Sequence, residues 1–508
     1  MSSTAKSNNI ATQLLKAIWL AAQGNEHQLK RVTFKAEGEL PSVFAVTDLA
    51  AAAMGAAGLA LSSLLDAIDL VSNGDLTDQT LARGTLHPTS ASAAEVAPSR
   101  HSATPTLAAA SIKTVTVDRR LASFWFAYSL RPIGWTPSSV EDFVVGDYQT
   151  ADGWIRLHTN APHHRAAALR ALNLAAPTER AEVAQAVATW PADALEAEVL
   201  AEGGCAATMR SWQDWQAHVQ GQSVLSEPLL HWQSGAQMAQ PLWAFNRNRP
   251  LQGLKVLDMT RVLAGPSATR MLAGLGAEVL RVDPPWWDEP TLAPEMTLGK
   301  RCTRLDLRNP SERERWISLL SEADVLVHGY RSDALATLGL DAKQRQKIRP
   351  GLVDISLDAY GFTGPWKQRR GFDSLVQMSM GIAHAGQQLA GSAKPKPLPV
   401  QALDHATGYI LATAALRGLE MRLRTGAGSI ACASLARTGA LLMTTLNHSE
   451  KSNQALAQET ESDQAPAIEN TYWGSARRLE WPIDVAGIKM QWDQPAGPLG
   501  SSDATWKR

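Results

Sequence analysis

The sequence predicts an α/β protein, with a doubly wound, Rossmann-like parallel sheet and a smaller α+β domain. Between residues 250 and 447, short apolar segments alternate with helical ones, a pattern typical of parallel βαβ units. A segment after residue 146 has a different pattern, with short strands beside polar helices. With 508 residues, the chain is long enough for two or more domains.

The large domain is predicted from four buried strands and the helices between them. Residues 265–275 form a helix that opens near Pro266, and proline suits the first turn of a helix. In sheets of this kind, ligands bind at the carboxyl ends of the strands. The predicted strands are 254–259, 278–283, 324–328 and 352–356.

The smaller domain is predicted from a strand at 152–158, helices at 162–172 and 178–188, and a glycine turn at 203–207 that leads into a strand. Two segments have the composition of linkers, because 72–113 is crowded with Ser, Thr, Ala, Pro and Gly and 448–471 is polar. The other parts are a partial large-domain segment at 1–71, a return helix and small α+β domain at 114–245, the Rossmann-like domain at 250–447, and a returning C-terminal segment at 472–508.

Composition excludes several classes of partner. The chain has 48 Lys and Arg against 49 Asp and Glu, so it lacks the positive charge expected for nucleic acid or an anionic membrane. We find no apolar run with the span of a membrane helix. Cys205, Cys302 and Cys432 have no metal-binding spacing. Few cysteines fit a reducing compartment, and we expect a cytoplasmic protein without a bound metal.

Asp404 is the most informative residue, because it lies at the start of an apolar helix rich in Ala and Gly. The common role of such an Asp is an N-cap, but the small side chains of the helix behind it leave room for a large group to lie close to the helix. Residues 40–59 echo 398–416 and place Asp48 near the position of Asp404, and 114–124 echo 428–437. The chain is therefore a partly duplicated unit. Asp48 is expected to be a relic that caps its helix.

The turn after the first large-domain strand distinguishes two ligand classes. A dinucleotide site requires G-x-G-x-x-G between strand and helix, whereas this turn reads Thr-Arg-Val-Leu-Ala-Gly-Pro from Thr260 to Pro266. Residues 250–279 are instead similar over their whole length to the opening βαβ unit of the family III CoA-transferases, the CaiB/BaiF group. The string Asp404-x-Ala-Thr-Gly-Tyr also resembles that family's nucleophile segment.

The resemblance implies a function and a set of site residues. Asp404 would be the nucleophile of a CoA-transferase that moves CoA between an acyl-CoA and a small carboxylic acid, through an aspartyl anhydride and an aspartyl-CoA thioester. CoA would be a substrate, and no permanently bound cofactor is implied. Because members of the family form dimers, the resemblance also implies either an intrachain pseudo-dimer of the duplicated parts or a homodimer. Thr337 and Asp358 depart from the family pattern, which has Arg at the first position and, in some transferases, Lys at the second. The implied CoA contacts are Val262, Leu263, Ala264, Lys300, Arg301, Gly329, Tyr330, Arg331 and Tyr360.

Two alternatives remain open. A CoA-binding or scaffold subunit without turnover would explain the departures from the family pattern. A racemase or isomerase needs a second proton carrier, and Phe372 stands where the racemase branch has histidine. His384 and His405 are the nearby substitutes. His163 and His164 resemble metal ligands, but adjacent helical residues point to different faces.

Overall fold

The computed structural model describes residues 3–72, 113–139, 142–238, 243, 245–331, 334–446, 454–485 and 487–507. Its centre is a seven-stranded sheet in the order β10-β9-β8-β11-β12-β13-β7, parallel throughout except for β7. From β8 the chain passes outward through β9 to β10, and then crosses to β11 on the other side of β8. The strands are β7 (His231–Gln237), β8 (Lys255–Met259), β9 (Glu278–Asp283), β10 (Lys300–Arg304), β11 (Val325–His328), β12 (Val353–Asp358) and β13 (Ala427–Ser434).

This strand order makes the boundary between β8 and β11 the switch point of the sheet, where a crevice opens at the carboxyl ends of the strands. The predicted α/β class is confirmed, and each of the four predicted strands is present with ends shifted by at most two residues.

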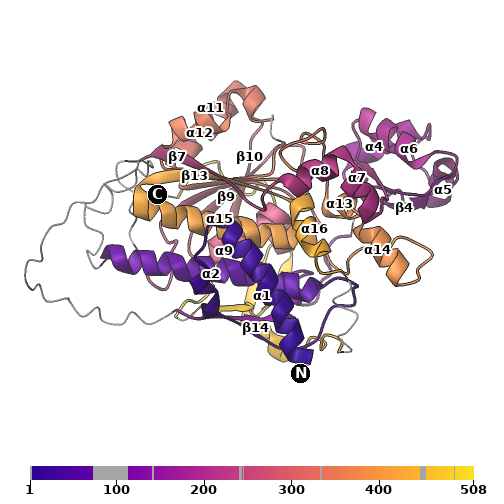
Figure 1. Cartoon of the computed structure of the whole chain (residues 1–508). Coiled ribbons are helices and arrows are strands. Elements are labelled where there is room, and N and C mark those ends of the chain that lie inside the picture. The colour runs from indigo at the N-terminus through magenta and orange to yellow at the C-terminus, as the bar shows by residue number, and fades with distance from the viewer. Residues whose placement is uncertain are drawn as a thin grey trace, which may run out of the picture.

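Helices cover both faces of the sheet (Figure 1). On one face, α11 buries Trp316 and Leu319 against alternate side chains of β8 and β9, such as Leu257 and Leu280. On the other face, α9 and α15 pack over Val256 and its neighbours. The helices of this domain are α9 (Ala264–Gly274), α10 (Ala293–Met296), α11 (Pro310–Glu322), η2 (Ala336–Leu338), α12 (Ala342–Ile348), α13 (Asp373–Ser379), α14 (Ile382–Leu389), α15 (Ala402–Thr425) and α16 (Leu435–Met443).

The smaller domain has its own three-stranded antiparallel sheet and its own apolar core. It lies at one end of the molecule in Figure 1 and contacts α13 through β5 and β6. Its elements are β4 (Gly146–Gln149), β5 (Trp154–Leu157), α4 (Pro162–Ala171), α5 (Arg180–Ala188), α6 (Ala192–Ala201) and β6 (Ala206–Thr208). Two short helices, α7 (Trp212–Ala217) and α8 (Val219–Ser226), lead back to the large sheet.

The N-terminal part repeats one edge of the large domain. β1 is parallel to β2, and β16 is antiparallel to β2, as β12 and β7 are to β13. α2 packs on β2 as α15 packs on β13, and the two helices pack against each other. The predicted duplication is therefore visible as structure. The elements of the N-terminal part, with the C-terminal strand that joins its sheet, are α1 (Ser3–Ala21), η1 (Glu26–Arg31), β1 (Val32–Lys35), α2 (Val46–Ser72), β2 (Val115–Asp118), α3 (Arg119–Trp125) and β16 (Ile483–Val485).

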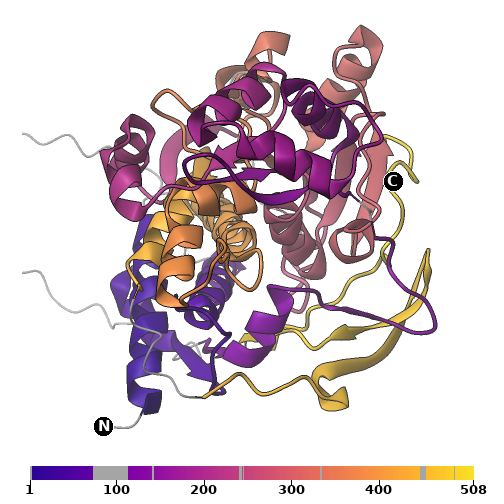
Figure 2. The same ribbon diagram turned by 90° about the vertical axis from the view of Figure 1, so that its right-hand side faces the viewer.

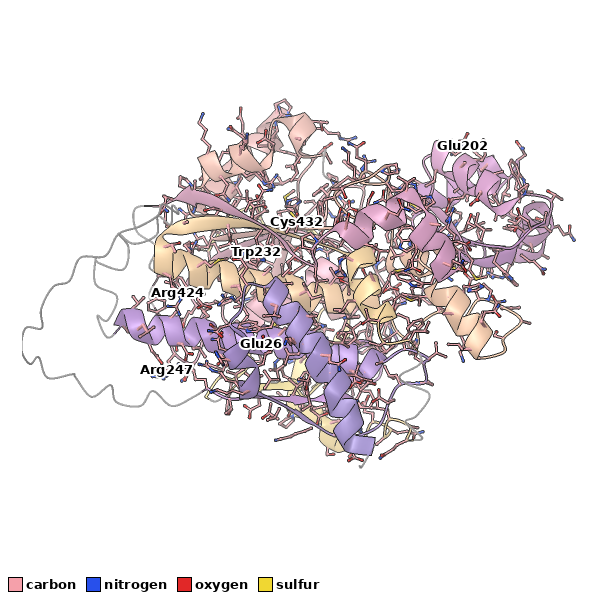
Figure 3. All side chains as sticks on the ribbon, viewed as in Figure 1. Glu26, Glu202, Trp232, Arg247, Arg424 and Cys432 are labelled. Atoms are coloured by element: carbon pink, nitrogen blue, oxygen red, sulfur yellow. The ribbon has the colours of Figure 1, made fainter. Side chains whose placement is uncertain are left out.

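Helix α2 corrects the expectation about membrane spans. By length and composition it is apolar enough to cross a membrane, but 94% of its most apolar stretch is buried in the protein. Its apolar sides face α1, α3 and α15. The α1 helix is also tied to the large sheet, because Trp232 Nε1 on β7 donates a hydrogen bond to the carbonyl of Ala21 (Figure 3). Burial against other helices accounts for the composition of α2.

The C-terminal segment joins the N-terminal layer to the sheet. A three-stranded sheet is formed by β3 (Leu130–Pro132), β14 (Gln464–Thr471) and β15 (Gly474–Leu479), and η4 (Glu461–Asp463) precedes it. The chain then runs along the sheet beside β10, where Ser502 N–H donates to the carbonyl of Cys302 (Figure 2).

A buried ionic cluster ties these parts together. Glu295 accepts hydrogen bonds from the N–H groups of Ser129 and Leu130, and it pairs with Arg270 and Arg478. The neighbouring guanidinium groups hold its pKa at about 2, against the effect of burial, which raises it. Removing Glu295 would therefore leave the buried Arg270 without its carboxylate partner, whereas Arg478 would keep its ion pair with Glu469.

Two predicted boundaries differ from the structure, and the structure does not test a third. Residues 231–237, expected in the small domain, form β7 in the large sheet because their backbone pairs with β13. The expected linker 448–471 includes β14, whose polar side chains are those of a largely solvent-facing antiparallel strand. Of the expected linker 72–113, residues 73–112 lie outside the described residues.

Candidate active site

A cavity of about 550 Å³ opens at the switch point of the sheet. Its floor is formed where β8, β11 and β12 end, at Met259, Gly329 and Asp358. The loop after β9, with Trp286 and Trp287, and Asp404 also line it. The first turn of α4 brings His163 and His164 of the smaller domain to the same cavity.

Arginines give this cavity a positive lining. Arg261, Arg331 and Arg370 all line it, and within the described part of the chain none of the three forms an ion pair. Arg261 lies between two aromatic rings, 4.8 Å from the ring centre of Trp287 and 5.2 Å from that of Tyr330. Stacking holds the guanidinium in place without neutralising it, so the cavity is suited to an anion with several charges.

Asp404 is positioned by the carboxylate of Asp373, and it does not cap its own helix. Asp373 Oδ2 accepts the N–H groups of Leu403 and Asp404, at 2.9 and 3.0 Å. These are free donors of the first turn of α15, so Asp373 fills the capping role that the sequence suggested for Asp404. The Asp404 carboxylate lines the cavity with 7% of its surface exposed, and within the described residues it accepts no hydrogen bond.

Burial and a like charge both favour the protonated form of Asp404. Burial raises the pKa of Asp404 well above its usual value, and the charge of Asp373 raises it further. Burial also raises the pKa of Asp373, to about 6, against its hydrogen bonds from the α15 backbone. Two adjacent carboxyl groups with raised pKa values mark a site of chemistry more often than a site of stability.

The helix behind Asp404 is close-packed against the helix that opens the large domain. A Cβ atom at Gly408 would lie 2.4 Å from the carbonyl oxygen of Ala264, so only glycine permits this approach. The contact fixes the start of α9 one turn from Asp404. The small residues noted in the sequence therefore serve a helix–helix contact.

Val262 has an unusual backbone at the edge of the cavity. Its φ is +65°, a conformation that β-branched residues rarely adopt. Its N–H donates to Glu289 Oε1 at 2.7 Å, and Glu289 is itself held by Arg281 and Trp287. Such strain persists where the surroundings enforce it, often at functional sites. The 284–292 loop therefore sets the conformation of the turn that carries Arg261.

Of the nine implied CoA contacts, the structure places five on the cavity: Val262, Ala264, Gly329, Tyr330 and Arg331.

The other four residues lie elsewhere. Lys300 is buried, because its Nζ binds Asp258 Oδ2 and the carbonyl of Pro266, each at 3.0 Å. Arg301 points to the C-terminal segment and binds the carbonyl of Thr505. Leu263 precedes α9 with its side chain buried. Tyr360 is fully buried, and its hydroxyl lies 3.1 Å from Ser379 Oγ. Leu263 and Tyr360 follow the ends of the predicted strands β8 and β12, but their side chains point into the core. Lys300 and Arg301 instead open β10, a strand that was not predicted.

Asp48 occupies the same place in α2 as Asp404 in α15, since each is the third residue of its helix. Its surroundings differ. Arg119 Nη2 binds Asp48 Oδ1 at 2.7 Å, and Arg119 also binds Glu39. Asp48 is 1% exposed. Because its carboxylate is held in a buried ion pair, Asp48 has no access comparable to that of Asp404.

The histidines that line the cavity are not the ones that the sequence suggested as proton carriers. His405 points away from the cavity; it lies against Phe126, and burial lowers its pKa to about 3. His384 on α14 is not part of the lining. The histidines that do reach the cavity are His163 and His164, which the sequence presented only as a weak metal motif. Only the tertiary contact of the small domain with α13 reveals their place.

Phe372, directly before α13, accounts for the contact between the smaller domain and that helix. Its ring stacks on His158, with ring centres 3.8 Å apart, and it meets the edge of His164 at 5.9 Å. Phe372 also lines the cavity, next to Asp373 in sequence. The residue that stands at the racemase-histidine position thus joins the two domains.

Comparisons with known proteins identify the family of the segment that carries Asp404. Residues 251–477 match the family model described as CoA-transferase family III. Human succinyl-CoA:glutarate CoA-transferase is 32% identical over 38% of this chain and 47% of its own length. A succinate–glutarate CoA-transferase from Agrobacterium fabrum is 31% identical over 36% of this chain and 50% of its own length.

Among solved structures, a CaiB/BaiF family protein from Brucella suis is 30% identical, covers 45% of this chain and 65% of its own, and has a TM-score of 0.35. This chain spans about half the length of the curated relatives named above. On the sequence matches, the segment 251–477 of this chain belongs to CoA-transferase family III.

Proposed function

We propose that this protein transfers CoA between an acyl-CoA and a carboxylic acid, with Asp404 as the nucleophile. The observation that supports this most strongly is the position of Asp404, whose carboxylate faces a cavity lined by unpaired guanidinium groups. The family of segment 251–477 and the names of its relatives, which state CoA transfer between dicarboxylates, support the same reaction.

CoA carries phosphates and an adenine, and one end of the cavity suits both. Arg261 and Arg331 supply positive charge, and Tyr330, Trp286 and Trp287 supply aromatic surface. Guanidinium groups bind phosphate through paired N–H donors, and aromatic rings stack on adenine. This end of the cavity would hold CoA with its thioester directed toward Asp404.

The reaction would proceed in two exchanges at one carboxylate. The ionised Asp404 attacks the thioester carbonyl, the C–S bond breaks, and a mixed anhydride and free CoA thiolate form. The thiolate then attacks the aspartyl carbonyl, which releases the first acid and leaves CoA on Asp404. A second acid reverses both steps. Covalent catalysis divides one difficult exchange into easier ones.

Asp373 would act as a positioning residue in this scheme. Its carboxylate holds the backbone of Leu403 and Asp404, and its charge helps to raise the pKa of Asp404. A higher pKa makes the carboxylate more basic, and a more basic carboxylate is the stronger nucleophile once ionised.

The test is isotope exchange between an acyl-CoA and its own labelled acid, across a panel of acyl chains. We expect exchange with at least one acyl-CoA, and loss of exchange in Asp404→Ala. Tight CoA binding without exchange on any acyl-CoA would favour the scaffold alternative. Deuterium uptake at the α-carbon of an acyl-CoA in heavy water, without an acceptor acid, would favour the racemase alternative and direct attention to His164.

We also propose that α2 and α15 make the chain an intrachain pseudo-dimer, since the duplicated helices already pack against each other. Sedimentation of the whole chain as a single 54.7 kDa species would support this. A stable species of twice that mass would support the homodimer.

A further inference from the structure

One carboxyl group on the cavity has no part in the proposed transfer. Asp358 is the last residue of β12 and lies on the cavity floor, 7% exposed. The register of the parallel pair β11 and β12 sets His328 beside Ser356, so the residues that follow β11, including Tyr330 and Arg331, leave the sheet next to Asp358. Asp358 therefore lies at the end of the cavity that would hold CoA.

The two carboxyl oxygens of Asp358 have different surroundings. Oδ1 accepts hydrogen bonds from the N–H groups of Tyr360, at 2.8 Å, and Gly361, at 3.2 Å. Oδ2 has no hydrogen-bond partner in the part of the chain that the structure describes, and it is not one of the enclosed side-chain atoms that lack a partner. Oδ2 is thus the oxygen that is open to the cavity. A proton on this carboxyl group would reside on Oδ2, because Oδ1 already faces two N–H donors.

The surroundings of Asp358 also disfavour its charged form. Among the described residues, no Lys, Arg or His forms an ion pair with Asp358, although arginines line the same cavity. The charge that acts on it is a like charge, from Glu227. Glu227 lies directly behind the turn that holds Asp358, since a Cβ atom at Gly361 would be 2.8 Å from Glu227 Oε2. Burial and a neighbouring carboxylate both favour a protonated carboxyl group.

The pKa values of the two acids differ in the direction that these contacts predict. Burial, together with the charge of Glu227, raises the pKa of Asp358 to about 7, against the backbone N–H groups of the turn, which lower it. Burial would raise the pKa of Glu227 too, but hydrogen bonds from His231 and Thr363 hold it below its usual value. Glu227 therefore stays ionised, and Asp358 changes its charge near neutral pH.

The other charged and titratable groups around Asp358 come from several elements. On α4, burial lowers the pKa of His163 and His164, so both rings are neutral near pH 7. On α15, burial and the charge of Asp373 raise the pKa of Asp404. His231 on β7 and Arg437 on α16 contact Glu227. The guanidinium groups that line the cavity stay charged throughout, and they belong to Arg261, Arg308, Arg331, Arg369 and Arg370.

We propose that Asp358 binds CoA as a neutral carboxylic acid, through a hydrogen bond that Oδ2–H donates to the ligand, and that ionisation of Asp358 weakens CoA binding. CoA as the ligand rests on the proposed function. A protonated carboxyl group supplies a donor that a carboxylate lacks, and a carboxylate on the cavity floor would repel the phosphates of CoA. The affinity for CoA would then fall as the pH rises through 7.

The experiment measures the Kd of CoA by calorimetry at pH 6, 7 and 8. The parent protein is Asp404→Asn, in which the nucleophile cannot titrate, and Asp358→Asn or Asp358→Leu is added to it. Dividing the Kd of the parent by the Kd of the Asp358→Asn protein at each pH cancels the titration of CoA and of the other groups. We expect this ratio to rise about tenfold from pH 6 to pH 8, because the protonated fraction of a group with a pKa of about 7 falls from about nine-tenths to one-tenth.

The leucine variant separates hydrogen bonding from repulsion, because leucine has neither a donor nor a charge. We expect Asp358→Leu to bind CoA about tenfold more weakly than Asp358→Asn, whose amide keeps a donor, at every pH. Equal affinities of these two variants would overturn the hydrogen bond.

A parent-to-Asn ratio that stays constant from pH 6 to pH 8, with CoA bound, would overturn the role of Asp358 and leave the proposed function standing. No binding of CoA by the parent at any pH would overturn both. If Asp358→Leu does not fold, the ratio for Asp358→Asn alone decides the proposal.

Discussion

The two duplicated helices allow one substitution to be tested in two settings. Asp404→Asn and Asp48→Asn change the same atom at the third residue of α15 and of α2. We predict opposite results, because Asp404 faces the cavity and Asp48 is held by Arg119. Asp404→Asn should abolish transfer and keep the fold, and Asp48→Asn should keep transfer and weaken the fold.

The cost of Asp48→Asn follows from the burial of its partner. Arg119 is 2% exposed and is shared between Asp48 and Glu39. Breaking a buried pair by removing one charge costs about 3–5 kcal/mol. Glu39 still pairs with Arg119, so we place the loss in the free energy of unfolding near the lower end, about 3 kcal/mol. This is more than a lost helix cap, which was the expectation from the sequence alone.

Asp404→Asn should behave in the opposite way. Burial and the charge of Asp373 raise the pKa of Asp404, so the folded state holds a proton that the unfolded state releases. Stability is therefore lost as pH rises from the unfolded pKa, near 4, toward the folded one. An amide removes that loss, and at pH 8 the variant should be at least as stable as the wild type. Loss of a lone nucleophile should lower the exchange rate by about a thousandfold or more.

The assay is isotope exchange at 25 °C, together with the midpoint of urea unfolding at pH 8. Asp48→Asn is expected to retain exchange within about threefold of the wild type, the factor by which ~0.6 kcal/mol changes a rate. Comparable losses of exchange in both variants would refute the division of roles between the helices. A lower midpoint for Asp404→Asn than for Asp48→Asn would refute the electrostatic reasoning.

Other predictions concern pH, the cavity floor and CoA binding. The kcat/KM for exchange should still rise with pH above the range in which an ordinary aspartate is already ionised, because only the ionised form of Asp404 is nucleophilic and burial raises its pKa; a pH-independent rate above pH 5 would contradict this. Burial raises the pKa of Asp358 to about 7. Asp358→Asn should therefore increase the free energy of unfolding by up to roughly 4 kcal/mol above pH 7 and leave it unchanged near pH 4. Urea unfolding at both pH values measures this difference. Arg331→Gln should weaken CoA binding in calorimetry by about tenfold, and an unchanged affinity would remove Arg331 from the CoA site.

The large domain could be predicted from the sequence because its signals are local. The four predicted strands, β8, β9, β11 and β12, are short and mostly apolar and buried, whereas β10 reads Lys-Arg-Cys-Thr-Arg and was not predicted. The turn at Val262 and the strand end at Gly329 follow from that pattern, since strand ends fix where a cavity opens. Asp404 was identified because its string resembles a family segment.

What could not be predicted depends on side-chain direction and on contacts between distant segments. Lys300 is the first residue of β10 and meets Asp258 in the core, whereas Arg261 follows the carboxyl end of β8 and lines the cavity. Because β10 was not predicted, the sequence did not show that Lys300 opens a strand. Asp373 likewise gives no sign in the sequence that it caps a helix thirty residues later.

The most direct test of the central claim is mass spectrometry of the protein after brief incubation with an acyl-CoA that supports exchange. Peptide mapping of the quenched protein should find CoA attached through a thioester to the peptide that contains Asp404, and hydroxylamine should convert that aspartate to a hydroxamate. The adduct should be absent in Asp404→Asn and present in Asp48→Asn. Exchange that proceeds with no adduct on Asp404, or with an adduct on another residue, would contradict the account.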